Sequence, residues 1–207
     1  MDLLRKKNRK LLTKTLIMSI LAMVFSLGII TASAATASWK TVGGSGFSAG
    51  AANYESLYVY KGTPYVAYDD TGNSDKVTVM KYNGSAWEPV GSVGFSAGEA
   101  YYTSLYVYGT SLVTDSGTPY VAYMDLYHDH KATVMKYNGS SWETVGSAGF
   151  SAGQAAYISL YVYDGTPYVA YMDSENLGKA TVMKYNGSSW ETVGNVAFSA
   201  NPAYYTS

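Results

Sequence analysis

The sequence predicts an all-β protein, a β-propeller of four-stranded antiparallel blades of which this chain holds about three and a half. Three observations predict this fold: a repeat of about 48 residues, four short strand patterns in each repeat, and strands that are apolar on both faces. Repeats of about 40 to 50 residues with four strands each are typical of propeller blades.

Four tryptophans mark the repeat. Trp39, Trp87, Trp142 and Trp190 stand 48, 55 and 48 residues apart. Each begins a W-x-x-V-G motif, which is followed by F-S-A-G or a variant, S-L-Y-V-Y, G-T-P-Y-V-A-Y, a variable loop and T-V-M-K-Y-N-G-S. The second unit is longer because residues 111–117 restart the strand phrase of residues 104–110, and either stretch fits the first strand of that blade.

The first complete unit divides into four strands, A to D, at residues 56–60, 64–68, 77–82 and 87–91. Strands A and B, and strands C and D, are separated by dipeptides that tolerate the positive φ of tight hairpin turns. These are Lys61-Gly62, Asp164-Gly165, Asn83-Gly84, Asn138-Gly139 and Asn186-Gly187. We therefore expect each unit to be an antiparallel meander.

Alternate connections of a meander lie at the same end of the sheet. The A to B and C to D turns should share one face, and the B to C and D to A loops the other. The B to C loops at residues 69–76, 124–131 and 172–179 are alike in length and different in content. The D to A loops at 94–98 and 149–153 both read G-F-S-A-G.

Strand polarity separates a propeller from a two-layer sandwich. A sandwich strand should alternate between apolar and polar residues because one of its faces is wet. Residues 57–60 and 65–68 are apolar on both faces, as in a sheet that is stacked between two others. This pattern favours the propeller over a sandwich or a solenoid.

The two ends of the repeat region predict an open structure. Residues 39–43 resemble a lone D strand, and residues 204–207 resemble the opening of an A strand. Three complete blades are fewer than the usual 4 to 8. Closing the ring would need further sequence or self-association, and an open structure would expose an apolar flank.

Residues 1–34 are predicted to be a signal peptide, which leaves residues 35–207 as the repeat domain. A basic segment precedes an apolar run at 16–30 and the small residues Ala32, Ser33 and Ala34. The run is shorter than the roughly 20 residues of a membrane-spanning helix. We therefore expect a secreted protein, outside the cell or attached to its wall, with no membrane span after cleavage.

The net charge and the composition limit the classes of partner that this chain could bind. Removing residues 1–34 leaves 8 Lys and Arg against 14 Asp and Glu, a net charge of 8 − 14 = −6. No basic patch is present to neutralise phosphates, so a nucleic acid partner is not expected. The chain has no cysteine, so its stability must come from packing, and its 22 tyrosines suit β-structure.

Residues 39–207 carry a family resemblance. The motifs G-T-P-Y-V-A-Y-x-D, K-A-T-V-M-K-Y-N-G-S-S-W-E-T-V-G and F-S-A-G resemble the repeats of large exported bacterial surface proteins. Such repeats are often assigned to propellers and joined to surface-layer homology or adhesion modules. The resemblance implies a display or binding role and no shared reaction.

Three recurring aspartates, Asp70, Asp125 and Asp173, follow strand B in successive units. They would either line a polar or cation-binding face or cap their own loops, which Asp does well. We expect capping. Trp87, Trp142 and Trp190 likewise either stack on sugars or fill the gap between blades, and one per blade at a fixed position favours filling.

One local cluster resembles a metal site. Asp125, His128, Asp129 and His130 combine carboxylates with imidazoles, which suit zinc or nickel. The cluster occurs in one unit only, so we expect a solvated loop with no metal, and we expect no cofactor elsewhere.

The predicted function is non-enzymatic binding of a glycan or a surface protein through the variable B to C loops. The candidate contact residues are Asp70, Asp125, His128, Asp129, His130, Asp173 and Glu175. One alternative is a structural spacer of a larger surface protein. The other is an exported carbohydrate-active hydrolase or lyase, for which Asp125, Asp129, Asp173 and Glu175 are the candidate acids.

Overall fold

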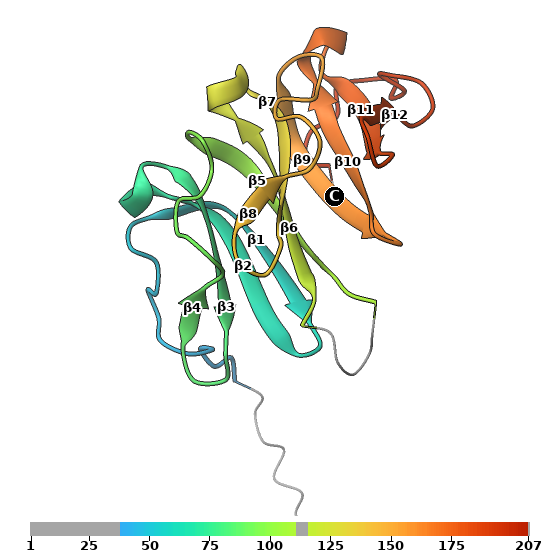
Figure 1. Cartoon of the computed structure of the whole chain (residues 1–207). Helices are drawn as coiled ribbons and strands as arrows, with labels where there is room; N and C mark the ends of the chain where they lie inside the picture. The colour runs from blue at the N-terminus through green and yellow to red at the C-terminus, as the bar shows by residue number, and fades with distance from the viewer. Residues whose placement is uncertain (1–37, 111–115, 207) are drawn as a thin grey trace, which may run out of the picture. The chain divides into compact units, whose positions relative to one another are not determined.

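The computed structural model describes residues 38–110 and 116–206 (Figure 1). The predicted signal peptide and residues 111–115 lie outside these ranges. The chain separates into a unit of residues 1–40 and a compact unit of residues 41–207, and the second unit contains every strand described below. No helix within the described ranges is long and apolar enough to cross a membrane.

The compact unit consists of three four-stranded antiparallel sheets, the blades of a partial β-propeller (Figure 1). Each sheet is a meander whose strand order in space follows the sequence. Blade 1 contains β1 (Ala52–Tyr60), β2 (Thr63–Asp70), β3 (Lys76–Tyr82) and β4 (Trp87–Pro89). Blade 2 contains β5 (Ala100–Tyr108), β6 (Thr118–Asp125), β7 (Lys131–Tyr137) and β8 (Trp142–Thr144). Blade 3 contains β9 (Ala155–Tyr163), β10 (Thr166–Asp173), β11 (Lys179–Tyr185) and β12 (Trp190–Thr192).

The tight turns form as the dipeptides predict. Lys61 and Gly62 have φ of 48° and 79°, and Asp164 and Gly165 have φ of 47° and 74°. Two consecutive residues with positive φ are the requirement of the type I′ turn, whose twist matches the flanking strands. The C to D turns are closed by their asparagine: Asn83 Oδ1 accepts the backbone N–H of Ser85 at 3.0 Å.

The second and third strands of each blade are joined at the other end by a 3₁₀ turn, labelled η1 (Thr71–Asn73), η2 (Leu126–His128) and η3 (Ser174–Asn176). The preceding strands are longer than predicted and include Asp70, Asp125 and Asp173 as their last residues. The predicted fourth strands, by contrast, shorten to three residues each.

The first strand of each blade carries a bulge that the sequence did not predict. In blade 1 the register between β1 and β2 shifts between Asn53 and Ser56, and the pairing then continues to Ala52. The strand therefore begins four residues before the predicted start. Tyr54 lies at the shift with a φ of 53°. This is the left-handed region that bulky residues rarely adopt. The second blade uses residues 104–108 in β5, which decides between the two candidate strand phrases.

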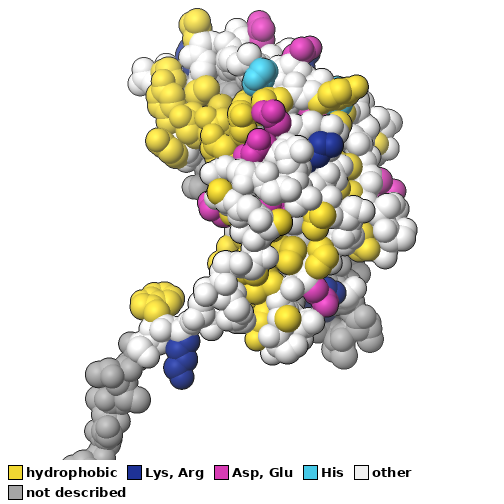
Figure 2. Space-filling model, turned by 90° about the vertical axis from the view of Figure 1, so that its left-hand side faces the viewer, with side chains coloured by type: hydrophobic (Ala, Val, Ile, Leu, Met, Phe, Trp, Pro, Cys, Tyr) yellow, Lys and Arg dark blue, Asp and Glu magenta, His cyan; other side chains and the backbone are white. Residues whose placement is uncertain are grey.

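Neighbouring blades bury the apolar faces of their first strands. Leu105 and Val107 of β5 are 4% and 1% exposed against blade 1. Leu57 and Val59, at the equivalent positions of β1, are 67% and 55% exposed, because no blade packs on them among the described residues. The predicted open flank is therefore present. The surface shown in Figure 2 also has hydrophobic side chains gathered in one area and few, scattered lysines.

The predicted strands at the two ends of the repeat region are wrong. Residues 38–51 form no strand, and residues 200–206 form none either. A strand needs a hydrogen-bonding neighbour, and neither segment has a partner strand of its own blade among the described residues. The repeat geometry persists locally: Val42 O still accepts the Trp87 indole N–H, and Tyr205 has a φ of 56°.

Candidate functional site

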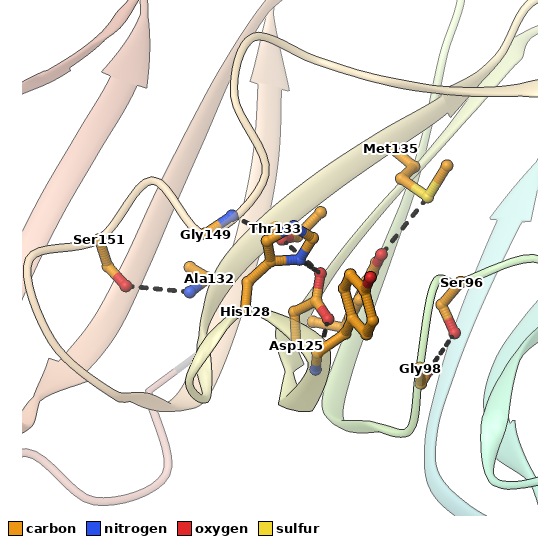
Figure 3. A network of polar contacts seen from close by, with 11 residues as sticks. Ser96, Gly98, Asp125, His128, Ala132, Thr133, Met135, Gly149 and Ser151 are labelled. Carbon is orange, nitrogen blue, oxygen red and sulfur yellow. Dashed lines mark hydrogen bonds and ion pairs between the residues drawn. The ribbon is translucent and has the colours of Figure 1, made fainter.

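The recurring aspartates lie inside their blades. Asp125 is buried, and its Oδ1 accepts the backbone N–H of Tyr127 at 3.1 Å (Figure 3). Its Oδ2 accepts the Thr133 hydroxyl at 2.8 Å, and Thr133 Oγ1 in turn accepts the N–H of Gly149 at 2.9 Å. The carboxylate thereby links the 3₁₀ turn to β7 and, through Thr133, to the loop that leads to the next blade.

The same network recurs in the other two blades. Asp70 Oδ1 accepts the Gly72 N–H at 3.1 Å, and Asp70 Oδ2 accepts the Thr78 hydroxyl at 2.9 Å. Asp173 Oδ2 accepts the Thr181 hydroxyl at 3.0 Å, whereas Asp173 Oδ1 is buried with no hydrogen bond among the described residues. Capping is therefore confirmed for Asp70 and Asp125. Ligand contact by these three buried carboxylates stays a prediction, and we build no site on it.

The histidine cluster does not converge on one point. His128 Nδ1 lies 2.8 Å from Asp125 Oδ2, in the position that Asn73 and Asn176 occupy in the other blades. His128 thus replaces an amide donor within the capping network (Figure 3). Asp129 is exposed, and Asp129 and His130 have φ of 56° and 62° as they leave the turn.

The described ranges contain no group of three or more His, Cys, Asp or Glu residues that is arranged to hold a metal ion. Glu175 is exposed in the corresponding turn of blade 3. Contact of Glu175, Asp129 and His130 with a ligand remains a prediction.

Trp142 and Trp190 join successive blades, as expected for the filling role, whereas Trp39 is fully exposed. The Trp142 indole N–H donates to Val90 O in the preceding blade at 2.8 Å, and its ring stacks on Phe95 with centroids 4.1 Å apart and planes 7° apart. Trp190 repeats both contacts with Val145 and Phe150. The recurring spacing of the W-x-x-V-G and F-S-A-G motifs therefore has a structural reason.

Two equivalent clefts lie between successive blades, at the end that carries the tight turns. The cleft between blades 1 and 2 and the cleft between blades 2 and 3 each have a volume of about 460 Å³. Tyr120 and Lys136 line both. The second cleft is completed by Val145, by the turn residues of blade 3 at 165–167 and 186–187, and by Tyr168, Lys184 and Tyr185.

The chemistry of these clefts is polar and aromatic. Burial raises the pKa of the Tyr120 hydroxyl, and the positive charge of Lys136 opposes part of this rise. The hydroxyl therefore stays a neutral donor at physiological pH. Lys136 Nζ lies 3.2 Å from Glu143 Oε1, and Lys184 Nζ lies 3.3 Å from Glu191 Oε1. Each ammonium keeps donors beyond this contact, because Lys has three.

Sequence reasoning missed these clefts because it placed recognition on the opposite end of the strands. Their signal was present in the repeat: a tyrosine after each Thr-Pro pair and a lysine near the end of each third strand. Binding by the variable loops is not tested by this geometry and stays a prediction.

A groove of tyrosines lies along the first strands, at the end that carries the variable loops. It has a volume of about 300 Å³ and is lined in part by Tyr54, Tyr102, Tyr157 and Tyr205, one from each repeat. Consecutive rings of this series lie 4.9 to 5.0 Å apart. All four residues have positive φ, at 53°, 54°, 51° and 56°. The bulge thus aligns one ring per repeat.

Comparison with known proteins yields structural neighbours only. No family model matches the chain, and no curated protein matches it. The Aleuria aurantia lectin, as a mutant in complex with Fucα1-6GlcNAc, matches at 16% identity and a TM-score of 0.49 over 71% of this chain and 48% of its own. A family 117 glycoside hydrolase from Zobellia galactanivorans matches at 12% identity and a TM-score of 0.47 over 76% of this chain and 58% of its own. A family 43 arabinoxylan arabinofuranohydrolase from Bacillus subtilis matches at 12% identity and a TM-score of 0.41, over 72% of this chain and 42% of its own. The chain therefore spans about half the length of the solved structures that it matches.

Proposed function

We propose that this protein is a non-enzymatic glycan-binding module with one binding site between each pair of successive blades. The observation that carries the proposal is the pair of equivalent clefts, equal in volume at about 460 Å³ and lined by the same residue types. This volume falls within the roughly 300 to 1,000 Å³ of small-molecule sites. A short saccharide fits such a cleft better than a flat protein surface does.

The lining suits a sugar. Tyrosine rings offer apolar faces, and their hydroxyls, together with the lysine ammonium groups, offer hydrogen bonds to ring hydroxyls. Among the described residues that line the two clefts, none is an aspartate or a glutamate. Glycoside hydrolysis uses a pair of carboxylates, so we propose binding without turnover. The predicted signal peptide supports a location outside the cell for this binding.

A glycan array followed by calorimetry tests the proposal. We expect the purified protein to retain a defined glycan, with more than one site per chain. Tyr120→Phe and Lys136→Gln should each weaken binding about tenfold, because one hydrogen bond to a charged or buried group contributes about 1.4 kcal/mol.

Lys179→Gln is the matched control, since Lys179 begins β11 at the opposite end of the strand. A folded protein that retains no glycan would contradict the proposal and favour a structural spacer. Equal affinities of the Lys136 and Lys179 variants would place the binding elsewhere, and release of a reducing sugar would contradict the absence of turnover.

A further inference from the structure

Blade 1 contains a buried carboxylate that has no counterpart in the other blades. Asp69 precedes the capping aspartate in β2 and is 2% exposed. Its Oδ1 is buried and has no hydrogen-bond partner among the described residues. A buried acceptor without a partner costs about 1–3 kcal/mol, and more when the group is charged. The fold therefore retains Asp69 at a cost to stability.

Asp69 lines a cleft of about 560 Å³ between β1 and β5. Glu55 and Asp75 also line this cleft, so three carboxylates face one space. The rings of Tyr54 and Tyr101 form its aromatic side and lie 5.3 Å apart. Tyr54 and Glu55 also line the tyrosine groove, so the two hollows share these two residues.

The acidic residues of this cleft are departures from the repeat. At the position of Asp69 the other blades have Met124 and Met172, and at the position of Glu55 they have Thr103 and Ile158. The equivalents of Asp75 are His130 and Gly178, and the equivalent of Glu99 in the next blade is Gln154. Blade packing does not require these acids, because the neighbouring blades form without them.

The charges around Asp69 are of one sign. Burial first, and then the charges of Asp75, Glu99 and Asp70, raise the pKa of Asp69 to about 6, while a hydrogen bond from Asn53 opposes them. Lys76 begins β3 opposite Asp70, and no cation is among the groups that lower the pKa of Asp69. The cleft therefore presents unneutralised negative charge beside aromatic rings.

We propose that this cleft binds an amino sugar, with the ligand's ammonium group beside the carboxylates of Asp69, Glu55 and Asp75 and its ring against Tyr54 and Tyr101. A primary ammonium offsets the repulsion among these carboxylates and donates charge-assisted hydrogen bonds to the oxygens that line the cleft. Cation–π attraction between the ammonium group and the face of a tyrosine ring further stabilises the bound ligand. A metal ion fits less well, because no three acidic or imidazole groups in the described ranges are arranged to hold one. This site is separate from the two clefts of the proposed glycan-binding function.

Calorimetry with two matched probes tests this inference. The probes are an oligomer of glucosamine with free amines and the same oligomer fully N-acetylated, which has no ammonium. Near pH 7 we expect the free amine form to bind at least tenfold more tightly. Asp69→Asn and Asp69→Met should each reduce that affinity at least tenfold, because a charge-assisted hydrogen bond contributes about 1.5–3 kcal/mol.

Asp164→Asn is the control for charge, since it removes one exposed acid outside the cleft. It should leave the affinity unchanged, and so should Lys136→Gln, which disables the other proposed sites. The affinity should also fall as the pH is lowered below about 6, because Asp69 becomes protonated there, whereas the amine, which is only partly charged near pH 7, is by then largely protonated.

Equal binding of the acetylated oligomer would overturn the inference, as would unchanged affinity in both Asp69 variants. Tighter binding of a lysine peptide, or heat from calcium that depends on Asp69, would overturn it by assigning the cleft to a different ligand. Circular dichroism of each variant establishes that it is folded, and Met at this position is the residue that the other two blades already use.

Discussion

Replacing Asp69 by methionine should make the protein more stable. The pKa of this carboxyl is about 6 in the folded protein against a reference of 3.8. Each pKa unit corresponds to about 1.4 kcal/mol, so the ionised carboxylate costs the folded state about 3 kcal/mol. Solvent in the cleft screens part of this charge, which reduces the cost by about 1 kcal/mol. The expected gain is about 2 kcal/mol in the free energy of unfolding near pH 7.

The sign of the pH dependence follows from the raised pKa. Between about pH 4 and 6 the folded state binds more protons than the unfolded chain, so Asp69 lowers stability as the pH rises through this window. Below about pH 4 the carboxyl is protonated in both states and costs little as a charge. The stabilisation by Asp69→Met should therefore be large near pH 7 and small near pH 4.

Urea unfolding followed by tryptophan fluorescence measures the gain in the free energy of unfolding near pH 7 and near pH 4. Glu175→Gln is the control and should change stability by less than about 0.5 kcal/mol, as is usual for exposed positions. An Asp69→Met variant that is no more stable than the parent near pH 7 would contradict this account. A gain of equal size at both pH values would assign the effect to packing instead of charge.

Three further substitutions, two of them with a matched control, test the packing and the capping network. Leu105→Ala should cost about 2–5 kcal/mol and Leu57→Ala less than about 0.5 kcal/mol. Only Leu105 is covered by a neighbouring blade, and equal costs in thermal unfolding would mean that the open flank is covered in solution. Gly91→Ala should cost more than about 1 kcal/mol, because a left-handed conformation strains any residue with a Cβ. The φ of Gly91 is +72° and its Cβ would lie 2.7 Å from a tyrosine ring of the next blade, whereas Gly44→Ala meets no atom within 4 Å; similar melting temperatures would contradict this difference. Thr133→Val should lower the free energy of unfolding in urea by about 2 kcal/mol, since two buried hydrogen bonds are lost. The Thr133 hydroxyl donates to Asp125 and accepts from Gly149, and a neutral result would show that the capping network contributes little.

The blade could be predicted because its determinants lie close together in the sequence. The hairpins at Lys61-Gly62 and Asp164-Gly165 depend on two residues that tolerate positive φ, and the structure forms both as type I′ turns. The capping roles of Asp70 and Asp125 likewise depend on donors two to eight residues away. Interactions of this range are visible in a single repeat.

The strand starts and the end segments could not be predicted in the same way. The bulge at Tyr54 adds residues to β1, because Asn53 pairs with Asp69 and Ala52 pairs with Asp70 beyond the shift in register. No local sequence pattern predicts that shift. Residues 39–43 carry a strand motif but form no strand, since a strand also requires a partner. Pairing of this kind depends on the sheet as a whole.

The repeat unit, the antiparallel meander, the turn types and the bridging role of the tryptophans follow from the sequence, because all of them rest on residues within one repeat or its neighbour. Which carboxylates are exposed depends instead on the folded chain. Folding buries Asp70, Asp125 and Asp173 within their blades and leaves Asp69 Oδ1 unpaired in a cleft. Burial and charge depend on groups that the adjacent blade supplies, such as Glu99 and Tyr101 near Asp69, and the packing of blades sets the distances to these groups.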